Sequence, residues 1–304
     1  LFHGQETPYV GMLSGVRDLP AVRDILERSE RVLGYDVLGV CTRGSLPRFN
    51  EASFRQPAAF IGGLAALEKL RSERGDLLAR CRAMAGMSVG EYTALCAAGV
   101  FTLEDGLRLV MLHGEAMEAA SALVQAAQVT VTGLEKMRLV DLCSEALKAE
   151  GGVCQISIEW FPRGFTVRGT LDAVLALERL VRAAGALHAE VMRVATAMHT
   201  PLLEPARERL DKALEEVLPR MKPPSCAVYM NGTAAPVKSH TNPKVIVTFL
   251  KLQLTSPVLW EQSVRAMIND GASEFYELGP SMKFKDMMKH INSRVSESTT
   301  CVQV

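Results

Sequence analysis

The stretch Gly86-Met87-Ser88-Val89-Gly90-Glu91 is a G-x-S-x-G element, and the interpretation of the whole chain starts from it. The apolar run at 81–85 predicts a short buried strand, and the helix formers at 89–98, followed by Gly99, predict a helix with a glycine C-cap. A serine on a tight turn between strand and helix is typical of a nucleophile elbow, where a Cβ at either flanking glycine would clash. The helix N-terminus would favour an oxyanion beside Ser88. A chance match in a glycine-rich loop is the alternative, which the strand and helix disfavour.

Composition sets the broad class. The 304 residues carry no net charge, have a pI near 7.2 and are 48% hydrophobic, as in an ordinary soluble globular protein. We therefore expect no nucleic-acid partner and no insertion into a membrane. No bound metal and no bound cofactor are expected either. The seven cysteines are scattered and odd in number, which excludes a fully paired disulfide framework and favours a reducing compartment.

Two patterns of elements alternate along the chain. Helices and short strands at 1–124 and 196–304 predict one large, discontinuous α/β domain. Between them, residues 125–195 predict a separate small domain with strands at 128–133, 153–160, 165–168 and 187–194 and helices at 135–150 and 171–184. That order, βαββαβ, is the ferredoxin-like unit. The last twelve residues are polar and are expected to fray.

A serine needs a base to become a nucleophile. Among the six histidines, His199 is favoured because it stands in a loop of small residues just before a helix, where the chain returns to the large domain. An ordinary loop histidine is the competing interpretation. No aspartate stands near His199 at a telling spacing, so a Ser–His dyad with a carbonyl-bound histidine is as plausible as a triad.

Several further blocks resemble one family, the malonyl-CoA:acyl carrier protein transacylases of fatty-acid synthesis, within the acyltransferases shared with polyketide and fatty-acid megasynthases. The opening Leu1-Phe2-His3-Gly4-Gln5 resembles LFPGQG, and the other blocks follow in family order to near the end of the chain. They are QPA at 56–58, GMSVGEYTAL at 86–95 against GHSLGEYSAL, AMHT at 197–200 against GAFHS, the strand and Asn turn at 228–234, QLTSPVLW at 253–260 against QLxSPVxW, and FYELGP at 275–280 against FxExGP.

The resemblance implies an α/β-hydrolase-like large domain with an inserted ferredoxin-like domain, and a ping-pong reaction. Ser88 would take a malonyl group from malonyl-CoA with His199 as base, and the phosphopantetheine thiol of acyl carrier protein would then accept it. The same resemblance assigns the oxyanion hole to the backbone N–H groups of Gln5 and Val89, places Asn231 beside the carbonyl that orients the histidine, and places Gln56 along the acyl pocket. It also implies a monomer in a reducing compartment, with the mitochondrial matrix or another fatty-acid-synthesising organelle favoured over bacterial cytoplasm.

The most informative departure is His113, which stands where malonyl-selective members carry an arginine in an LVxxRGxxM block. A guanidinium grips a carboxylate through two parallel hydrogen bonds, whereas a histidine is mostly neutral near pH 7. Either His113 is protonated by the malonyl carboxylate and does the arginine's work more weakly, or the substrate is acetyl or another neutral acyl group. Arg108 is not one or two helical turns from His113, so it is not a simple replacement.

Other departures lie close to the reacting residues. Met87 replaces the usual histidine beside the nucleophile, and Met198 replaces the phenylalanine before His199; both are expected to line the acyl pocket, although methionine is more often core filler. Glu6 and Gly164 also depart from the family pattern. A serine thioesterase on the same fold and a non-enzymatic binder of acyl carrier protein remain alternatives, and the intact Ser88 and His199 argue against the second.

Overall fold

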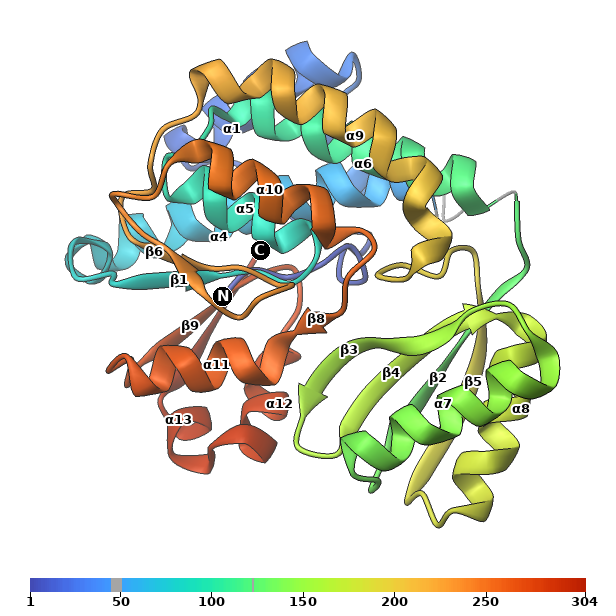
Figure 1. Ribbon diagram of the computed structural model, residues 1–304. Coiled ribbons are helices and arrows are strands. Elements are labelled where there is room, and N and C mark those ends of the chain that lie inside the picture. The colour runs from blue at the N-terminus through green and yellow to red at the C-terminus, as the bar shows by residue number, and fades with distance from the viewer. Residues whose placement is uncertain (45–50, 122) are drawn as a thin grey trace.

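The computed structural model describes residues 1–44, 51–121 and 123–304, so residues 45–50 and 122 of the predicted large domain lie outside it. It has a mixed α/β fold (Figure 1). The helices are α1 (Pro20–Leu33), α2 (Val37–Arg43), α4 (Ala52–Ala79), α5 (Val89–Ala97), α6 (Leu103–Ser121), α7 (Lys136–Glu150), α8 (Leu171–Ala183), η1 (Pro201–Leu203), α9 (Glu204–Val217), η2 (Leu218–Arg220), α10 (Pro243–Gln253), α11 (Trp260–Asn269), α12 (Phe284–Ile291) and α13 (Ser293–Glu297). The strands are β1 (Ala83–Ala85), β2 (Ala126–Thr132), β3 (Cys154–Phe161), β4 (Gly164–Thr170), β5 (His188–Val194), β6 (Ala227–Tyr229), β7 (Pro236–Val237), β8 (Val258–Leu259), β9 (Phe275–Gly279) and β10 (Thr299–Gln303).

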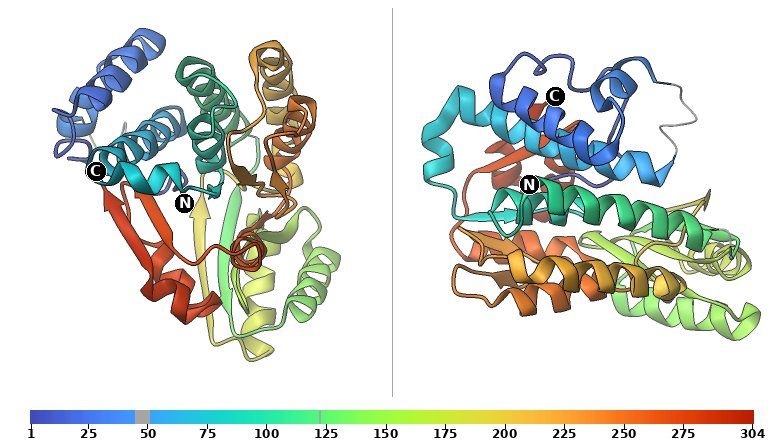
Figure 2. Two further views of the ribbon diagram at one scale, coloured as in Figure 1. Left: turned by 90° about the vertical axis from the view of Figure 1, so that its left-hand side faces the viewer. Right: turned by 90° about the horizontal axis from the view of Figure 1, so that it is seen from above.

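The first residues of the chain join the strands of the larger part into one layer. Strands β7, β6 and β1 are neighbours, and β9 pairs in parallel with β10. Phe2 forms parallel bridges to Gly86 and to Leu278, so it connects the two groups. Helices α4, α5, α6 and α10 cover one side of this layer and α11 to α13 the other (Figures 1 and 2). The loops after Phe2, β1 and β6 therefore meet at the carboxyl edge of the parallel strands, where crevices form in open α/β sheets.

The smaller part has its own sheet and its own core. Strands β5, β2, β4 and β3 are adjacent in that order and all pair antiparallel. Helices α7 and α8 cover one face (Figure 1), and the apolar side chains beneath them form a cluster separate from the large core. These two helices do not cover the opposite face of the sheet. Every second residue of each strand points to that face.

One strand ties the two parts together. β8, in the segment just after α10, pairs in parallel with β3 through Ile158–Val258 and Glu159–Leu259. The sheet of the smaller part thus ends on a strand of the larger part. This pairing positions β3 and β4 against the loops at the carboxyl edge of the large sheet.

The prediction that the C-terminal residues fray is wrong. Residues 293–297 form α13, and β10 pairs with β9 along its whole length. Val302 and Val304 are buried, so two apolar side chains anchor this polar segment.

Over residues 1–44, 51–121 and 123–304, no helix is long and apolar enough to cross a membrane. Within the same residues, no three His, Cys, Asp or Glu side chains are grouped so that they could hold a metal ion. The cysteines at 41, 81, 96, 143, 154, 226 and 301 are all free thiols.

Candidate active site

Ser88 stands on a strained turn between β1 and α5, as the G-x-S-x-G pattern predicts. Its φ of 54° and ψ of −117° lie in a region that side chains rarely adopt. A Cβ on Gly86 would lie 1.9 Å from the carbonyl oxygen of Gly90, and one on Gly90 would lie 2.4 Å from that of Phe2. Only glycine fits at both positions, and the turn they allow lifts Ser88 above the strand ends.

His199 contacts the serine directly. Its Nε2 lies 3.2 Å from Ser88 Oγ, and its Nδ1 lies 2.8 Å from the backbone carbonyl oxygen of Gln253. A carbonyl can only accept, so Nδ1 carries the proton and Nε2 is free to accept from the serine hydroxyl. Burial, helped by the nearby charge of Arg168, lowers the pKa of His199 to about 3. The arrangement is a dyad with a neutral base, one of the two possibilities left open by the sequence.

The side chain of Asn231 binds the elbow, and its predicted place beside the carbonyl that orients His199 stays a prediction. Asn231 follows β6: its Oδ1 accepts from the Ser88 N–H at 2.7 Å, and its Nδ2 donates to the Gly86 carbonyl at 2.6 Å. His199 is oriented from α10, by the Gln253 carbonyl. The asparagine therefore fixes the strained backbone of the nucleophile.

A buried carboxyl group connects these parts. Glu91 Oε1 accepts from the Asn231 N–H at 2.7 Å, and Gln253 Nε2 donates both to Glu91 Oε2 at 2.6 Å and to the Ser88 carbonyl at 2.7 Å. Burial raises the pKa of Glu91 to about 8, although both hydrogen bonds act in the other direction. Sequence reasoning quoted Glu91 and Gln253 within family blocks but gave neither a role. The available signal was Glu91 itself, a charged residue in the otherwise apolar first turns of a predicted helix.

The two predicted oxyanion donors flank the serine. Val89 begins α5, and the first N–H groups of a helix have no intrahelical acceptor. Gln5 is held from two sides, because Arg55 Nε donates to its carbonyl and Gln56 Nε2 donates to its Oε1, each at 2.9 Å. Both residues are thereby fixed beside Ser88, and their role as oxyanion donors stays a prediction.

A cleft opens in front of the dyad, between the elbow and the helix-free face of the small sheet. Ser88, His199, Met87 and Met198 line it, as predicted for the two methionines. Its other lining residues include Gly4, Gln5 and Glu6 from the first loop, Gln128, Thr130 and Thr132 from β2, Ile158, Trp160 and Phe161 from β3, and Gly164, Phe165, Thr166 and Arg168 from β4. Gln56 is not on this wall: it is buried behind Gln5, and its Nε2 also contacts Met117 Sδ.

His113 does not line this cleft either. It is 1% exposed on α6, and its ring meets the Tyr92 ring edge-on with centroids 5.7 Å apart. Neither ring nitrogen makes a hydrogen bond of ordinary geometry among the described residues. Burial lowers the pKa of His113 to about 4, although the nearby Gln253 side chain acts to raise it, so the ring is neutral near pH 7. The hypothesis that His113 is protonated by the substrate carboxylate and binds it concerns the substrate-bound state, and it stays a prediction.

Sequence reasoning missed Arg168. It considered only Arg108, whose side chain is 58% exposed and pairs with Asp105. Arg168 lies in the middle of β4, is 3% exposed and lines the cleft. A charged residue in the apolar alternation of 164–170 was the available signal, and it could not be interpreted without knowing which face of the sheet the side chain enters.

The model of the acyl transferase domain matches residues 1–300. The chain belongs to the acyl transferase family. It is 35% identical to the mitochondrial malonyl-CoA-acyl carrier protein transacylase of Mus musculus, over 100% of this chain and 81% of that protein.

Two solved structures of acyl transferase relatives are similar over the whole chain. The acyl-carrier-protein-S-malonyltransferase of Bartonella henselae has a TM-score of 0.92 at 25% identity, and the match covers 100% of this chain and 94% of that one. A malonyl-transacylase in complex with its type II PKS acyl-carrier protein has a TM-score of 0.89 at 27% identity, again covering 100% and 94%.

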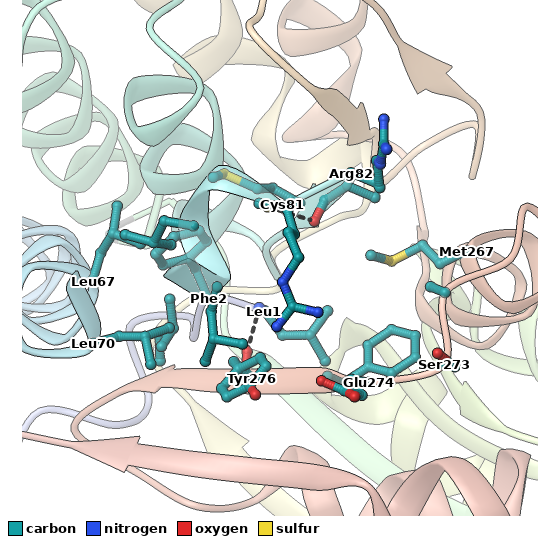
Figure 3. A pocket seen from close by; sticks show the side chains of 18 of the residues that line it. Leu1, Phe2, Leu67, Leu70, Cys81, Arg82, Met267, Ser273, Glu274 and Tyr276 are labelled. Atoms are coloured by element: carbon teal, nitrogen blue, oxygen red, sulfur yellow. Dashed lines mark hydrogen bonds between the residues drawn. The ribbon is translucent and has the colours of Figure 1, made fainter. Parts of the chain in front are cut away.

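A second cavity of this acyl transferase lies away from the dyad, at the amino ends of β1 and β9 (Figure 3). Its wall is mostly apolar, with Leu67 and Leu70 on one side and Met267 on the other. The amino group of Leu1 donates to the Tyr276 carbonyl at 2.7 Å within it. It contains no serine–histidine pair and takes no part in the chemistry described below.

Proposed function

We propose that this acyl transferase moves a malonyl group from malonyl-CoA to the phosphopantetheine thiol of acyl carrier protein through an acyl-Ser88 intermediate, and so supplies fatty-acid synthesis. The observation that carries the proposal is the 3.2 Å contact between Ser88 Oγ and His199 Nε2, on a histidine whose Nδ1 is bound to a carbonyl. The choice of malonyl as the acyl group and of acyl carrier protein as the acceptor is supported by the names of the mouse relative and of the two solved structures.

In the first half-reaction, Ser88 Oγ attacks the thioester carbon and its proton passes to His199 Nε2. The carbonyl oxygen becomes an oxyanion, which the N–H groups of Val89 and Gln5 stabilise. When the tetrahedral intermediate collapses, the carbon–sulfur bond breaks and the CoA thiolate takes the proton from Nε2. The acyl group remains as an ester on Ser88.

The second half-reaction reverses these roles. The phosphopantetheine thiol gives its proton to His199 Nε2 as its sulfur attacks the ester carbon, and the Ser88 oxygen recovers a proton as it leaves. A histidine that is neutral before each attack suits both steps, and the depressed pKa of His199 keeps it neutral. Met87 and Met198 provide the apolar wall beside the acyl chain.

The partners follow from the same reaction. Acyl-CoA and acyl carrier protein enter in turn, neither a metal nor a bound cofactor takes part, and the enzyme works as a monomer. The mitochondrial names of the mouse, human and fly relatives support a mitochondrial location.

The fold is an α/β-hydrolase-like domain formed by 1–124 and 196–304, with a ferredoxin-like domain at 125–195 inserted in it. The support is the order β2-α7-β3-β4-α8-β5, the strand neighbours β5-β2-β4-β3 and the separate apolar cluster of this segment. The insertion provides the second wall of the cleft.

A neutral acyl group remains the second candidate, because His113 is buried and neutral. Intact-mass spectrometry after incubation with malonyl-CoA or acetyl-CoA decides between them, with acyl carrier protein added afterwards. We expect a malonyl adduct that is absent from Ser88→Ala, and malonyl carrier protein as product. An acetyl adduct alone would establish the neutral acyl group, free malonate would establish a thioesterase, and no adduct with either thioester would refute the proposed function.

A further inference from the structure

Arg168 is buried in the wall of the cleft at the centre of a row of polar side chains. In the antiparallel sheet it is directly opposite Gln128 of β2 and Gln155 of β3. Directly opposite residues on neighbouring strands point to the same face of a sheet. The hydrogen bonds of Gln128 and Gln155 therefore show which face the Arg168 side chain joins. Arg168 Nε donates to Gln128 Oε1 at 3.0 Å, and Gln155 Nε2 donates to the backbone carbonyl of His199 at 3.1 Å. The row therefore faces the catalytic histidine.

The guanidinium has more donors than partners. A guanidinium presents five N–H donors, yet Nη1 of Arg168 is buried without a hydrogen bond among the described residues. Nη2 forms a long ion pair with Glu6 Oε1 at 3.8 Å, too far for a hydrogen bond, and the Glu6 side chain is 60% exposed. Burying a cation is costly unless it is paired and hydrogen-bonded. The guanidinium therefore has hydrogen-bond donors left for an anion in the cleft.

The same cation acts on the reaction centre. Arg168 and Ser88 line one cleft, and the charge of Arg168 contributes to the low pKa of His199. An acyl group on Ser88 would lie in this cleft, whose wall includes Arg168. His113, the residue at which the sequence suggests a carboxylate contact, has no place in the cleft wall.

We propose that Arg168 of the small sheet binds the free carboxylate of the acyl group through Nη1 and Nη2, so that the site selects thioesters of dicarboxylic acids over neutral acyl thioesters. This inference rests on the proposed function, whose acyl-Ser88 it requires. Two parallel hydrogen bonds from one guanidinium fix both the charge and the direction of the carboxylate. Glu6 is 60% exposed and makes no hydrogen bond to the guanidinium, while Gln128 Oε1 accepts from Nε.

The test measures acylation of Ser88 by malonyl-CoA and by acetyl-CoA in the parent, in Arg168→Gln and in Arg168→Lys. The matched control is Arg193→Gln, which removes the same charge from exposed β5 of the same sheet. For Arg168→Gln we expect kcat/KM with malonyl-CoA to fall about 10- to 100-fold, the factor for losing a charged hydrogen-bonded pair, with acetyl-CoA unchanged or faster. Arg168→Lys should retain part of the selectivity, and Arg193→Gln all of it.

The acetyl reaction shows whether each variant is folded. A malonyl-to-acetyl ratio that stays within about twofold of the parent in a folded Arg168→Gln would overturn the inference and leave the proposed function intact. If Arg168→Gln does not fold, Arg168→Lys decides, since an unchanged ratio there, without the planar fork, also overturns it. A parent that is acylated by neither thioester refutes the proposed function itself.

Discussion

The two walls of the cleft differ in how completely their polar groups are paired. On the elbow wall, Ser88, Asn231, Glu91 and Gln253 are joined by hydrogen bonds of 2.6–2.7 Å that fix the nucleophile from several sides. On the sheet wall, Arg168 is equally buried but leaves Nη1 unpaired.

This difference separates two tasks. A group that moves protons or attacks must have one geometry before the substrate arrives, so its supports are complete in the free enzyme. A group that recognises the substrate needs hydrogen-bond donors that are unpaired in the free enzyme. On our proposal, the larger part of the molecule carries the reacting groups and the small sheet selects the acyl group.

The largest effect is expected on the elbow wall, from His199→Ala. Without a base the serine hydroxyl is a poor nucleophile, so acylation with either thioester should slow by about 10³-fold or more. Rapid-quench measurement of the Ser88 adduct checks this. His188→Ala, an exposed histidine of β5, is the control. Acylation of His199→Ala within about tenfold of the parent rate would show that another group takes the proton.

Asn231→Ala removes both hydrogen bonds that hold the strained turn. The Gly86 carbonyl and the Ser88 N–H are left unpaired, so the free energy of unfolding should fall by about 2–3 kcal/mol, and acylation should slow for both thioesters alike. Denaturant titration and adduct kinetics measure the two effects. Asn242→Ala, which removes only the N-cap bond of α10, should cost about 1 kcal/mol with no change in acylation.

The same variant tests whether Asn231 also acts on His199. Because Gln253 rather than Asn231 holds His199 Nδ1, the acid limb of the pH–rate profile should be the same in Asn231→Ala as in the parent. A shifted limb would mean that the asparagine does influence the base.

The pH dependence of acylation tests whether Arg168, on the sheet wall, acts on His199. His199 must be neutral to act, and burial together with Arg168 lowers its pKa from 6.5 to about 3. In the parent, kcat/KM for acylation should therefore stay level as the pH falls through 6.5 and decline only well below it. In Arg168→Gln the decline should begin at higher pH, although still below 6.5, because burial is the larger cause. Acetyl-CoA serves as substrate for both proteins, and identical acid limbs would contradict the coupling.

The smallest effect on activity is expected from His113→Gln, since His113 is outside the cleft wall. In the folded chain the pKa of His113 is about 4, below its ordinary value of 6.5. Between these two pH values the unfolded chain binds a proton at this residue and the folded chain does not, so the free energy of unfolding falls as the pH drops below 6.5. Between pH 7 and about pH 5 this costs roughly 2 kcal/mol, which the variant should recover in urea titrations at the two pH values. A changed malonyl-to-acetyl ratio in this variant would show that His113 contributes to substrate recognition.

The sequence by itself determined the elements that depend on neighbours along the chain. The G-x-S-x-G pattern predicted strand, turn and helix because two glycines and a serine at fixed spacing permit one backbone geometry. The alternating and helical periodicities of 125–195 predicted each of its strands and helices to within about two residues, because period 2 and period 3.6 are local properties. His199 was found because it stands in a loop at the return to the large domain.

Only the tertiary structure decided which distant groups meet. The Gln253 carbonyl on His199, the pairing of Asn231 with the elbow and the docking of β8 on β3 join segments far apart in the chain, and local pattern contains no information about them. The same holds for His113 and Arg168. The first occupies a family position yet is buried behind the cleft, whereas the second belongs to no quoted block yet enters the cleft, because the pairing of β4 with β2 and β3 decides which face its side chain joins.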